Sequence, residues 1–194
     1  PLARLHVFKG ASGANASTFS PMVVESDGNT YLNLLSPAAN ESGILFGRPG
    51  SEAHGAIIYN NSETTDGFQF RDKENTTQMV IDQNGRIGLG VTAPQYPISM
   101  NGTTGDKISL WTDGSSTHYG LGVQSGLLQF FAKTINDDIA FGYVRSSNFT
   151  ERMRIKGNGN AGFGNSNPAY RLDVSGRMRI RSDGSNSVSA GVWL

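Results

Sequence analysis

The residues that could carry chemistry in this chain are few and scattered. Its three histidines, His6, His54 and His118, show no HxH or HxxxH spacing. Spacing of that kind is what lets two imidazoles share one metal ion, so we expect the histidines to be surface or turn residues. The chain has no cysteine, which excludes disulfides, thiolate catalysis and zinc ribbons together.

Paired carboxylates are the next candidates, because most glycosidases use two of them. Asp137 and Asp138 are the only adjacent acidic pair in the sequence. Neighbouring residues of a strand point to opposite faces, which is poor geometry for two carboxylates acting on one bond. The first half of the chain has only Glu63 and Thr64 at the equivalent positions. The pair therefore predicts no hydrolytic site.

The remaining polar motifs favour turns over ligand sites. The Asp-Gly pairs that begin at Asp27, Asp113 and Asp183 resemble the start of a calcium loop, but the other acidic ligands of such a loop are missing, so a turn is the better interpretation. Gly88-x-Gly90 precedes no predicted helix, and a phosphate loop needs one. We expect no enzyme activity, no cofactor and no metal.

Aromatic side chains offer one further function, because they can stack on sugar rings. Trp111 and Tyr119 are the candidate glycan contacts, with Phe130, Phe131 and Trp193 as further aromatic residues in the same half of the chain. Aromatic residues in strands more often form cores. A packing role is therefore favoured over a glycan site, and both interpretations stay open.

The composition is that of a turn-rich β protein with a thin core. Hydrophobic residues make up 37% of the 194 residues, and charged residues only 16%, against the usual quarter. The 16 basic and 16 acidic residues are interspersed and cancel, so nothing indicates binding to nucleic acid or to an anionic membrane. No apolar run is long enough to insert into a bilayer. Oligomerisation is the expected source of the missing stability.

The elements follow from a motif that occurs twice. Residues 78–102 read QMVIDQNGRIGLGVTAPQYPISMNG, and residues 152–176, which begin 74 positions later, read RMRIKGNGNAGFGNSNPAYRLDVSG. The two segments align without a gap. They share an Asn-Gly pair, alternating glycines and a proline. Self-similarity at a fixed offset predicts a repeat protein.

Each motif predicts a strand, a hairpin turn, a second strand, a proline-marked corner and a third strand. The Asn84-Gly85 and Asn158-Gly159 pairs predict two-residue type I′ turns. Glycine then recurs at alternate positions, at Gly88 and Gly90 in the first copy, so one face of that strand is bare backbone. We expect another backbone or a ligand to pack against it. A threefold axis where three chains meet is one way to supply that contact.

The repeats divide the chain into four parts. Residues 1–7 form the tail of a preceding repeat, residues 8–102 a unit with an inserted strand, residues 103–176 a second unit, and residues 177–194 the start of a further, truncated unit. The parent sequence is therefore expected to extend beyond at least one end.

Short β-branched or aromatic segments bounded by turn residues predict strands throughout, among them residues 31–35 after an Asp27-Gly28 hairpin turn. No segment keeps a helical period over a dozen residues. The expected fold class is all-β, a repeat of short-stranded modules.

The repeated motif resembles a known family. NGRIGLGVTAPQYPI and GNAGFGNSNPAYRLDVSG are similar to the repeat of phage tail fibres and related bacterial fibre proteins, written N-G-N-V-G-I-G-T-x-x-P-x-x-x-L-x-V-x-G. The resemblance covers about 25 residues twice, together with residues 1–7. Ala161, Phe163 and Pro97 depart from the residues that the family favours at those positions.

The resemblance implies that the all-β modules form an elongated repeat in an intertwined or side-by-side homotrimeric fibre, on a virion, an injection machine or a bacterial surface. The expected function is therefore a structural shaft or spacer that presents a receptor-binding tip, with other copies of the chain as partners, together with other fibre or baseplate proteins. The expected location is extracellular or on a virion surface. The alternative is a glycan-binding adhesin module, or the fibre tip itself, which would contact a cell-surface glycan.

Overall fold

The chain is all-β. The computed structural model describes residues 5–114, 116–145 and 148–178, and these ranges contain strands and turns but no helix; accordingly, no membrane-spanning helix is found in them. The chain divides after Gly102 into two compact units, Pro1–Gly102 and Thr103–Leu194. Asp183, Trp193 and most of the truncated unit expected at residues 177–194 lie outside the described residues.

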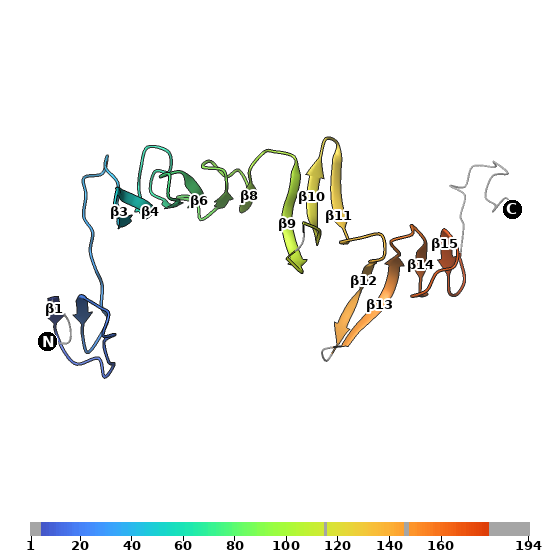
Figure 1. The fold of residues 1–194 in the computed structure, drawn as a ribbon, viewed down its shortest axis with the longest axis horizontal. Helices are drawn as coiled ribbons and strands as arrows, with labels where there is room; N and C mark the ends of the chain where they lie inside the picture. The colour runs from blue at the N-terminus through green and yellow to red at the C-terminus, as the bar shows by residue number, and fades with distance from the viewer. Residues whose placement is uncertain (1–4, 115, 146–147, 179–194) are drawn as a thin grey trace. The chain divides into compact units, whose positions relative to one another are not determined.

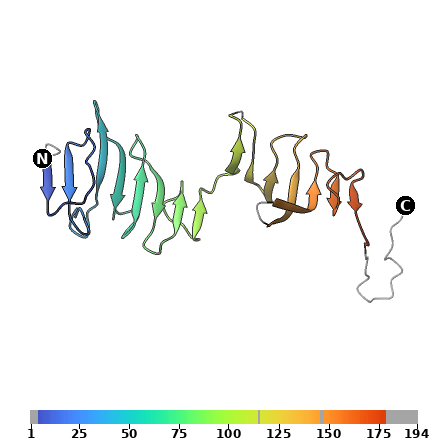
Figure 2. The ribbon, with the colours of Figure 1, turned by 90° about the horizontal axis from the view of Figure 1, so that it is seen from below.

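The first unit holds strands β1 to β8 (Figure 1). β1 (Leu5–Phe8) pairs in parallel with β2 (Met22–Glu25). A six-stranded sheet follows in sequence order, made of β3 (Ser42–Arg48), β4 (Ser51–Tyr59), β5 (Phe68–Arg71), β6 (Thr77–Ile81), β7 (Ile87–Leu89) and β8 (Ile98–Met100). Its pairs are antiparallel except the last, β7 with β8, which is parallel. Figure 2 shows these strands side by side.

The second unit holds two smaller sheets. β9 (Gly105–Thr112), β10 (His118–Gln124) and β11 (Leu127–Phe131) form an antiparallel sheet with β10 in the middle. β12 (Ile139–Arg145), β13 (Asn148–Ile155), β14 (Ala161–Phe163) and β15 (Leu172–Val174) form a four-stranded sheet in sequence order. Here too the last pair is parallel and the others are antiparallel.

The prediction of a strand at residues 31–35 is wrong. These residues have no regular structure, and Tyr31 and Leu35 are exposed. Gly28 lacks the positive φ that a type I′ hairpin turn requires. An apolar segment becomes a strand only where another strand satisfies its backbone groups, and the described residues place none beside this one.

The two motif segments have the same strand pairing. In the first, Met79, Val80 and Ile81 oppose Leu89, Gly88 and Ile87, and in the second, Met153, Arg154 and Ile155 oppose Phe163, Gly162 and Ala161. The parallel pairs also correspond, since Ile87 opposes Ile98 and Ala161 opposes Leu172. The two segments therefore agree in strand number, direction and register.

The turn within each motif differs from the expected type I′ turn. That turn needs positive φ at both central residues, and Gly85 has φ 75° whereas Asn84 does not have a positive φ. The Gly85 N–H donates to the Asp82 carbonyl at 2.9 Å, and the Asp82 N–H donates to the Arg86 carbonyl at 3.0 Å. This is a three-residue loop with its glycine in the left-handed region, as in a type I turn with a G1 bulge. The second motif forms the same loop, with Gly159 at φ 87° and its N–H bonded to the Lys156 carbonyl at 2.8 Å. The Asp82 carboxylate, which accepts from the Asn84 and Arg86 N–H groups, therefore supports the loop in the first motif but is not required for it.

The expected close approach to the alternating glycines is present, and the chain itself supplies it. A Cβ at Gly88 would lie 2.2 Å from the carbonyl oxygen of Val91, and a Cβ at Gly162 would lie 2.1 Å from the carbonyl oxygen of Asn165. The proline corner after each strand thus folds back onto the glycine, and Pro94 is fully buried there. At Gly88 and Gly162 no room is left for a second chain.

The core of the six-stranded sheet lies on the same face as Gly88. Gln69 and Val80 oppose each other on β5 and β6, and Val80 opposes Gly88 on β7. Apart from the prolines of the two corners, the buried apolar side chains among the described residues are Ala56, Ile58 and Val80. All three belong to this sheet, so the described part of the second unit has no comparable core.

Replacing Gly88 by alanine should destabilise the first unit. The added methyl group would overlap the Val91 carbonyl oxygen, and overpacking of this kind costs about 1–3 kcal/mol. We expect a lower midpoint of denaturant-induced unfolding for Gly88→Ala. Gly55→Ala is the matched control, because its Cβ would meet its nearest neighbour, the Arg71 carbonyl oxygen, at 3.6 Å, an ordinary contact. Equal midpoints for the two variants would show that the proline corner shifts to accommodate the methyl group without a loss of stability.

Candidate functional site

One face of the six-stranded sheet carries large apolar side chains that the described part of the chain leaves partly exposed. Because strand side chains alternate between faces, the register places these residues in two rows across β3 to β8. One row is Tyr59, Phe68, Ile81, Ile87 and Ile98, and the other is Ile44, Ile57, Phe70, Met79, Leu89 and Met100. We call this surface the apolar face. Phe68 is 45% exposed and Ile98 is 64% exposed.

The unpaired segment at residues 31–35 borders this face. Leu32 and Leu34 line a groove of about 410 Å³ together with Ile44, Ile57 and Phe68. Leu32 and Leu34 themselves remain exposed, so the segment flanks the apolar face without burying it.

The four-stranded sheet of the second unit has an apolar face of the same kind. Its rows are Ile139, Ile155, Ala161 and Leu172, and Phe141, Met153, Phe163 and Val174. Phe141, Phe163 and Leu172 are each about half exposed. Ile87 and Leu89 of the first motif and Ala161 and Phe163 of the second all lie on these two faces.

The solvent-exposed area of the whole chain also indicates that a single copy buries little of its surface. The chain exposes 14951 Å² of surface at a mass of 20.7 kDa. A compact monomer of that mass would expose about 8,900 Å², and its unfolded chain about 30,000 Å². A single copy therefore buries only about half of its unfolded surface, where a domain of this length normally buries about 70%.

The face opposite the apolar face carries the small buried core of the first unit together with hydrogen-bonded polar side chains. In the first unit it carries the buried Gln69. At the position of Val80, the second unit has Arg154, whose guanidinium donates to Glu151 at 2.6 Å and to Asp138 at 2.7 Å. This face thus combines glycine, amide and ion-paired side chains with the buried Ile58 and Val80, whereas the other face carries the exposed apolar rows.

The two candidate glycan contacts lie next to each other. Trp111 opposes Tyr119 across β9 and β10, with ring centroids 5.7 Å apart. The Lys133 ammonium lies 5.6 Å from the centre of the Trp111 ring and pairs with Asp113, while the Tyr119 hydroxyl donates to Asp137 at 2.7 Å. Trp111 is 55% exposed.

The remaining aromatic candidates divide between the two faces of that sheet. Leu121 opposes Phe130, and it lies on the same face of β10 as Tyr119. Phe131 opposes Gly120 on the other face, with its ring 5.1 Å from the His118 ring. The pair of Trp111 and Tyr119 therefore continues an apolar surface, which fits a packing role as well as a sugar platform.

The polar candidates from the sequence do not come together. His6 bonds to Glu25 at 3.0 Å, and His118 lies 3.5 Å from Asp106. Within the described ranges, no three His, Asp or Glu side chains are placed to hold a metal ion.

The adjacent carboxylates also have different partners. Asp137 accepts from Tyr119 and Thr134, and Asp138 from Arg154 and the Gly157 N–H. Hydrogen bonds from Thr134 and Tyr119 lower the pKa of Asp137. The Asp137 bond in turn raises the pKa of Tyr119. Both carboxylates are therefore ionised hydrogen-bond acceptors with assigned partners.

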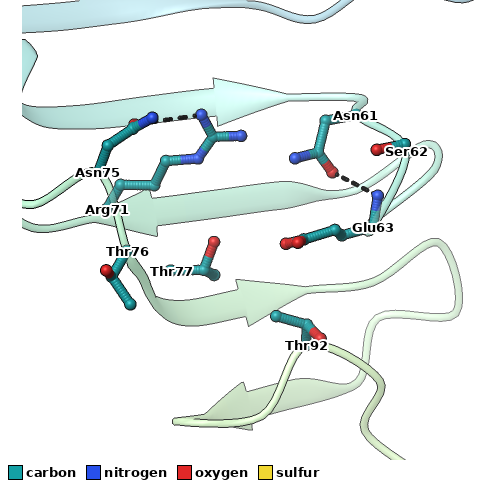
Figure 3. A pocket seen from close by; sticks show the side chains of 8 residues that line it. All are labelled: Asn61, Ser62, Glu63, Arg71, Asn75, Thr76, Thr77 and Thr92. Carbon is teal, nitrogen blue, oxygen red and sulfur yellow. Dashed lines mark hydrogen bonds between the residues drawn. The ribbon is translucent and has the colours of Figure 1, made fainter.

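A polar pocket in the first unit was missed by sequence reasoning. It has a volume of about 460 Å³ and is lined by Asn61, Ser62, Glu63, Arg71, Asn75, Thr76, Thr77 and Thr92 (Figure 3). Its residues come from separate turns and strand ends, so no sequence motif connects them. The one signal in the sequence was Gln69, a polar residue between Phe68 and Phe70 in a predicted strand.

The Arg154 cluster makes the second unit sensitive to acid. Hydrogen bonds from Arg154 lower the pKa of Glu151 below its ordinary value of 4.5. Burial raises the pKa of Asp138, but the bonds from Arg154 and Gly157 outweigh it and the net shift is downward. Folded Glu151 therefore binds protons less readily than unfolded Glu151, so its contribution to stability is full above pH 4.5 and is lost as the pH falls through its folded pKa.

Glu151→Gln should remove part of this pH dependence. We expect the variant to be less stable at neutral pH, because Arg154 loses a charged partner, and to lose less stability between about pH 5 and pH 3 than the unmodified chain. Unfolding curves measured across that range give the slope. Glu52→Gln, at an exposed glutamate of β4, should leave the slope unchanged. An unchanged slope in Glu151→Gln would contradict the assignment.

No protein-family model matches this sequence, and a comparison with curated proteins gives no match either.

Proposed function

We propose that this chain is a structural shaft segment of a trimeric fibre, a tail fibre or a fibre-like appendage that presents a receptor-binding tip. Its main partners are two further copies of itself, and other fibre or baseplate proteins adjoin it. Its place is outside the cell, on a virion or on an injection machine. The chain acts as a spacer, so it needs no catalytic centre.

The observation that carries the proposal is the apolar face in each unit. Large side chains such as Phe70 and Phe163 stay partly exposed, although each contributes about 1.5–3 kcal/mol when fully buried. Contiguous exposed apolar surface of this kind marks an interaction site. Since both units carry it in the same register, a partner with the same repeat is the simplest cover.

Three copies fit this surface and agree with the family resemblance. Three sheets that turn their apolar faces inward enclose a core from which the polar faces all point outward. Two sheets packed face to face would also cover the apolar residues. The choice of three rests on the N-G-x-x-G-x-G repeat, which resembles that of trimeric fibres.

A glycan-binding module is the second candidate. The pair of Trp111 and Tyr119 supports it, because a half-exposed tryptophan beside charged side chains can take a sugar ring. The shaft interpretation comes first, since the same aromatic pair continues the apolar surface of its sheet.

The molar mass in solution tests the proposed function. We expect light scattering to give three times the chain mass of 20.7 kDa, and cross-linking to stop at three chains. Phe70→Asp places a charge in the centre of the apolar face and should yield monomers, because an unpaired charge is strongly disfavoured in an apolar contact.

Gln83→Asp is the control for that variant. It adds the same charge to the same unit at an exposed turn residue, so the assembly should persist. A monomeric unmodified chain, or a dimer, would overturn the trimeric shaft.

The second candidate has its own test. A shaft should give at most weak signals when the assembled chain is screened on a glycan array. A tight and specific signal that disappears in Trp111→Ala, with the molar mass unchanged, would instead identify a lectin-like module centred on β9 and β10.

A further inference from the structure

The polar pocket of the first unit has the features of a ligand site built on one chain. The turn after β4 contributes Asn61, Ser62 and Glu63, and the end of β5 contributes Arg71. The turn between β5 and β6 contributes Asn75 and Thr76, the start of β6 contributes Thr77, and Thr92 follows β7. Figure 3 shows these side chains gathered over the strands, with Arg71 bonded to Asn75 at one end and Asn61 bonded to the Glu63 backbone at the other.

A buried glutamine holds the pocket walls in place. Gln69 is 1% exposed, and both ends of its amide are bonded. Its Oε1 accepts from Asn61 Nδ2 at 3.0 Å, from Arg71 Nε at 2.9 Å and from Thr77 Oγ1 at 3.2 Å. Its Nε2 donates to Asn61 Oδ1 at 2.9 Å and to Thr64 Oγ1 at 2.9 Å. Three of the lining side chains are therefore pre-organised, which reduces the entropy lost on binding a ligand.

The pocket still has free donors and acceptors. Within the described part of the chain, the Glu63 carboxylate makes no hydrogen bond or ion pair, and in Figure 3 it points toward the middle of the group. Arg71 uses three of its five N–H donors, on Gln69, Asn75 and Glu41. The hydroxyl groups of Ser62, Thr76 and Thr92 add groups that both donate and accept.

These groups select the chemical class of the ligand. Anions are disfavoured, because Glu41 already pairs with Arg71 at 2.9 Å and Glu63 adds an uncompensated negative charge. A divalent cation would need more than the one free carboxylate. An apolar ligand would leave the polar walls unpaired. A neutral molecule with several hydroxyl groups satisfies both the carboxylate and the donors.

We propose that this pocket binds a neutral saccharide, with Glu63 accepting hydrogen bonds from sugar hydroxyls and Arg71 and Asn75 donating to its oxygens. The pocket is open and has no aromatic wall, so one chain binds weakly, with a Kd of about 1 mM or above. Gln69 and Arg71 point away from Phe68 and Phe70 along β5. Covering the apolar face thus leaves the pocket exposed.

The site itself belongs to one chain and does not depend on the proposed shaft, but its strength on a surface does. A trimer would present three pockets, and simultaneous contact with a glycan-coated surface would raise the effective affinity without any new contact. The proposed shaft would then also bind sugars weakly along its side.

Saturation-transfer NMR on the full chain tests this inference, with glucose, galactose, mannose and N-acetylglucosamine as probes. We expect saturable binding of at least one of these sugars. Glu63→Gln should weaken it about tenfold, because hydrogen bonds to charged groups are stronger than those to neutral ones. Glu52→Gln, the same change at an exposed strand residue outside the pocket, should bind like the unmodified chain. Thr92→Val removes one lining hydroxyl without touching the Gln69 network and should weaken binding by a smaller factor.

Three outcomes would overturn the inference. One is the absence of saturable binding up to about 20 mM sugar, well above the expected Kd. Another is binding that Glu63→Gln leaves intact and Trp111→Ala abolishes, which would place the sugar on the aromatic pair. The third is tighter binding of sialic acid or inorganic phosphate than of any neutral sugar. Light scattering and unfolding midpoints on the same samples keep the two proposals apart, since a folded trimer without sugar binding refutes only the pocket, and a monomer that binds sugar refutes only the shaft.

Discussion

The hydrophobic effect acts on this chain mainly through a surface that one copy cannot cover. Protein domains normally bury an apolar sheet face against a second layer of structure, and the described residues provide no second layer over the rows that contain Phe70 and Phe163. What the chain buries alone is small, namely Ala56, Ile58, Val80 and the proline corner around Pro94. One copy alone therefore gains little stabilisation from apolar burial, and in the proposed trimer the rest would come from contacts between copies.

The opposite face shows how one framework carries different chemistry. Gly88 and Gly162 occupy the same place in the two motifs, and each accepts the backbone of the corner that follows. Beside them the first unit places Val80 opposite Gln69, whose amide is bonded to Asn61 and Arg71, whereas the second unit places Arg154 among carboxylates. The apolar face is alike in both units, and the polar face differs. Assembly and surface chemistry can thus vary independently, as expected when sites are added to a common scaffold.

Local patterns predicted most of the strands, and they failed where distant residues decide the structure. Alternating apolar residues and Asn-Gly pairs indicated β6, β7, β13 and β14, and the glycine spacing indicated a close backbone contact. The type I′ turn predicted at Asn84-Gly85 was wrong, because only the glycine takes a positive φ and the loop has three residues, in this motif and in the second one. Residues 31–35 have a strand's pattern but no neighbouring strand.

The candidate sites, too, could be predicted from the sequence only where local patterns decide the structure. The sequence singled out Trp111 and Tyr119 as candidates, and their cross-strand pairing became visible only in the structure. The polar pocket depends on hydrogen bonds between Gln69 and side chains two to eight residues away. These side chains lie on the turn after β4, on β5 and on β6. No sequence pattern encodes such a convergence, because each residue taken alone is an ordinary turn or strand residue.

The order of the strands has a consequence for how the chain reaches its final state. From β3 to β8, every strand pairs with its neighbour in sequence, and short loops between partners make such sheets fast to form. Each sheet can therefore appear during synthesis, before another copy is present. In that interval the outer edges of β3 and β8 and the uncovered rows are open to any similar chain, which is the situation that leads to misassembly. If the proposed trimer is correct, efficient production of the protein would depend on how quickly copies meet, and keeping nascent chains close together on one messenger RNA would shorten that exposure.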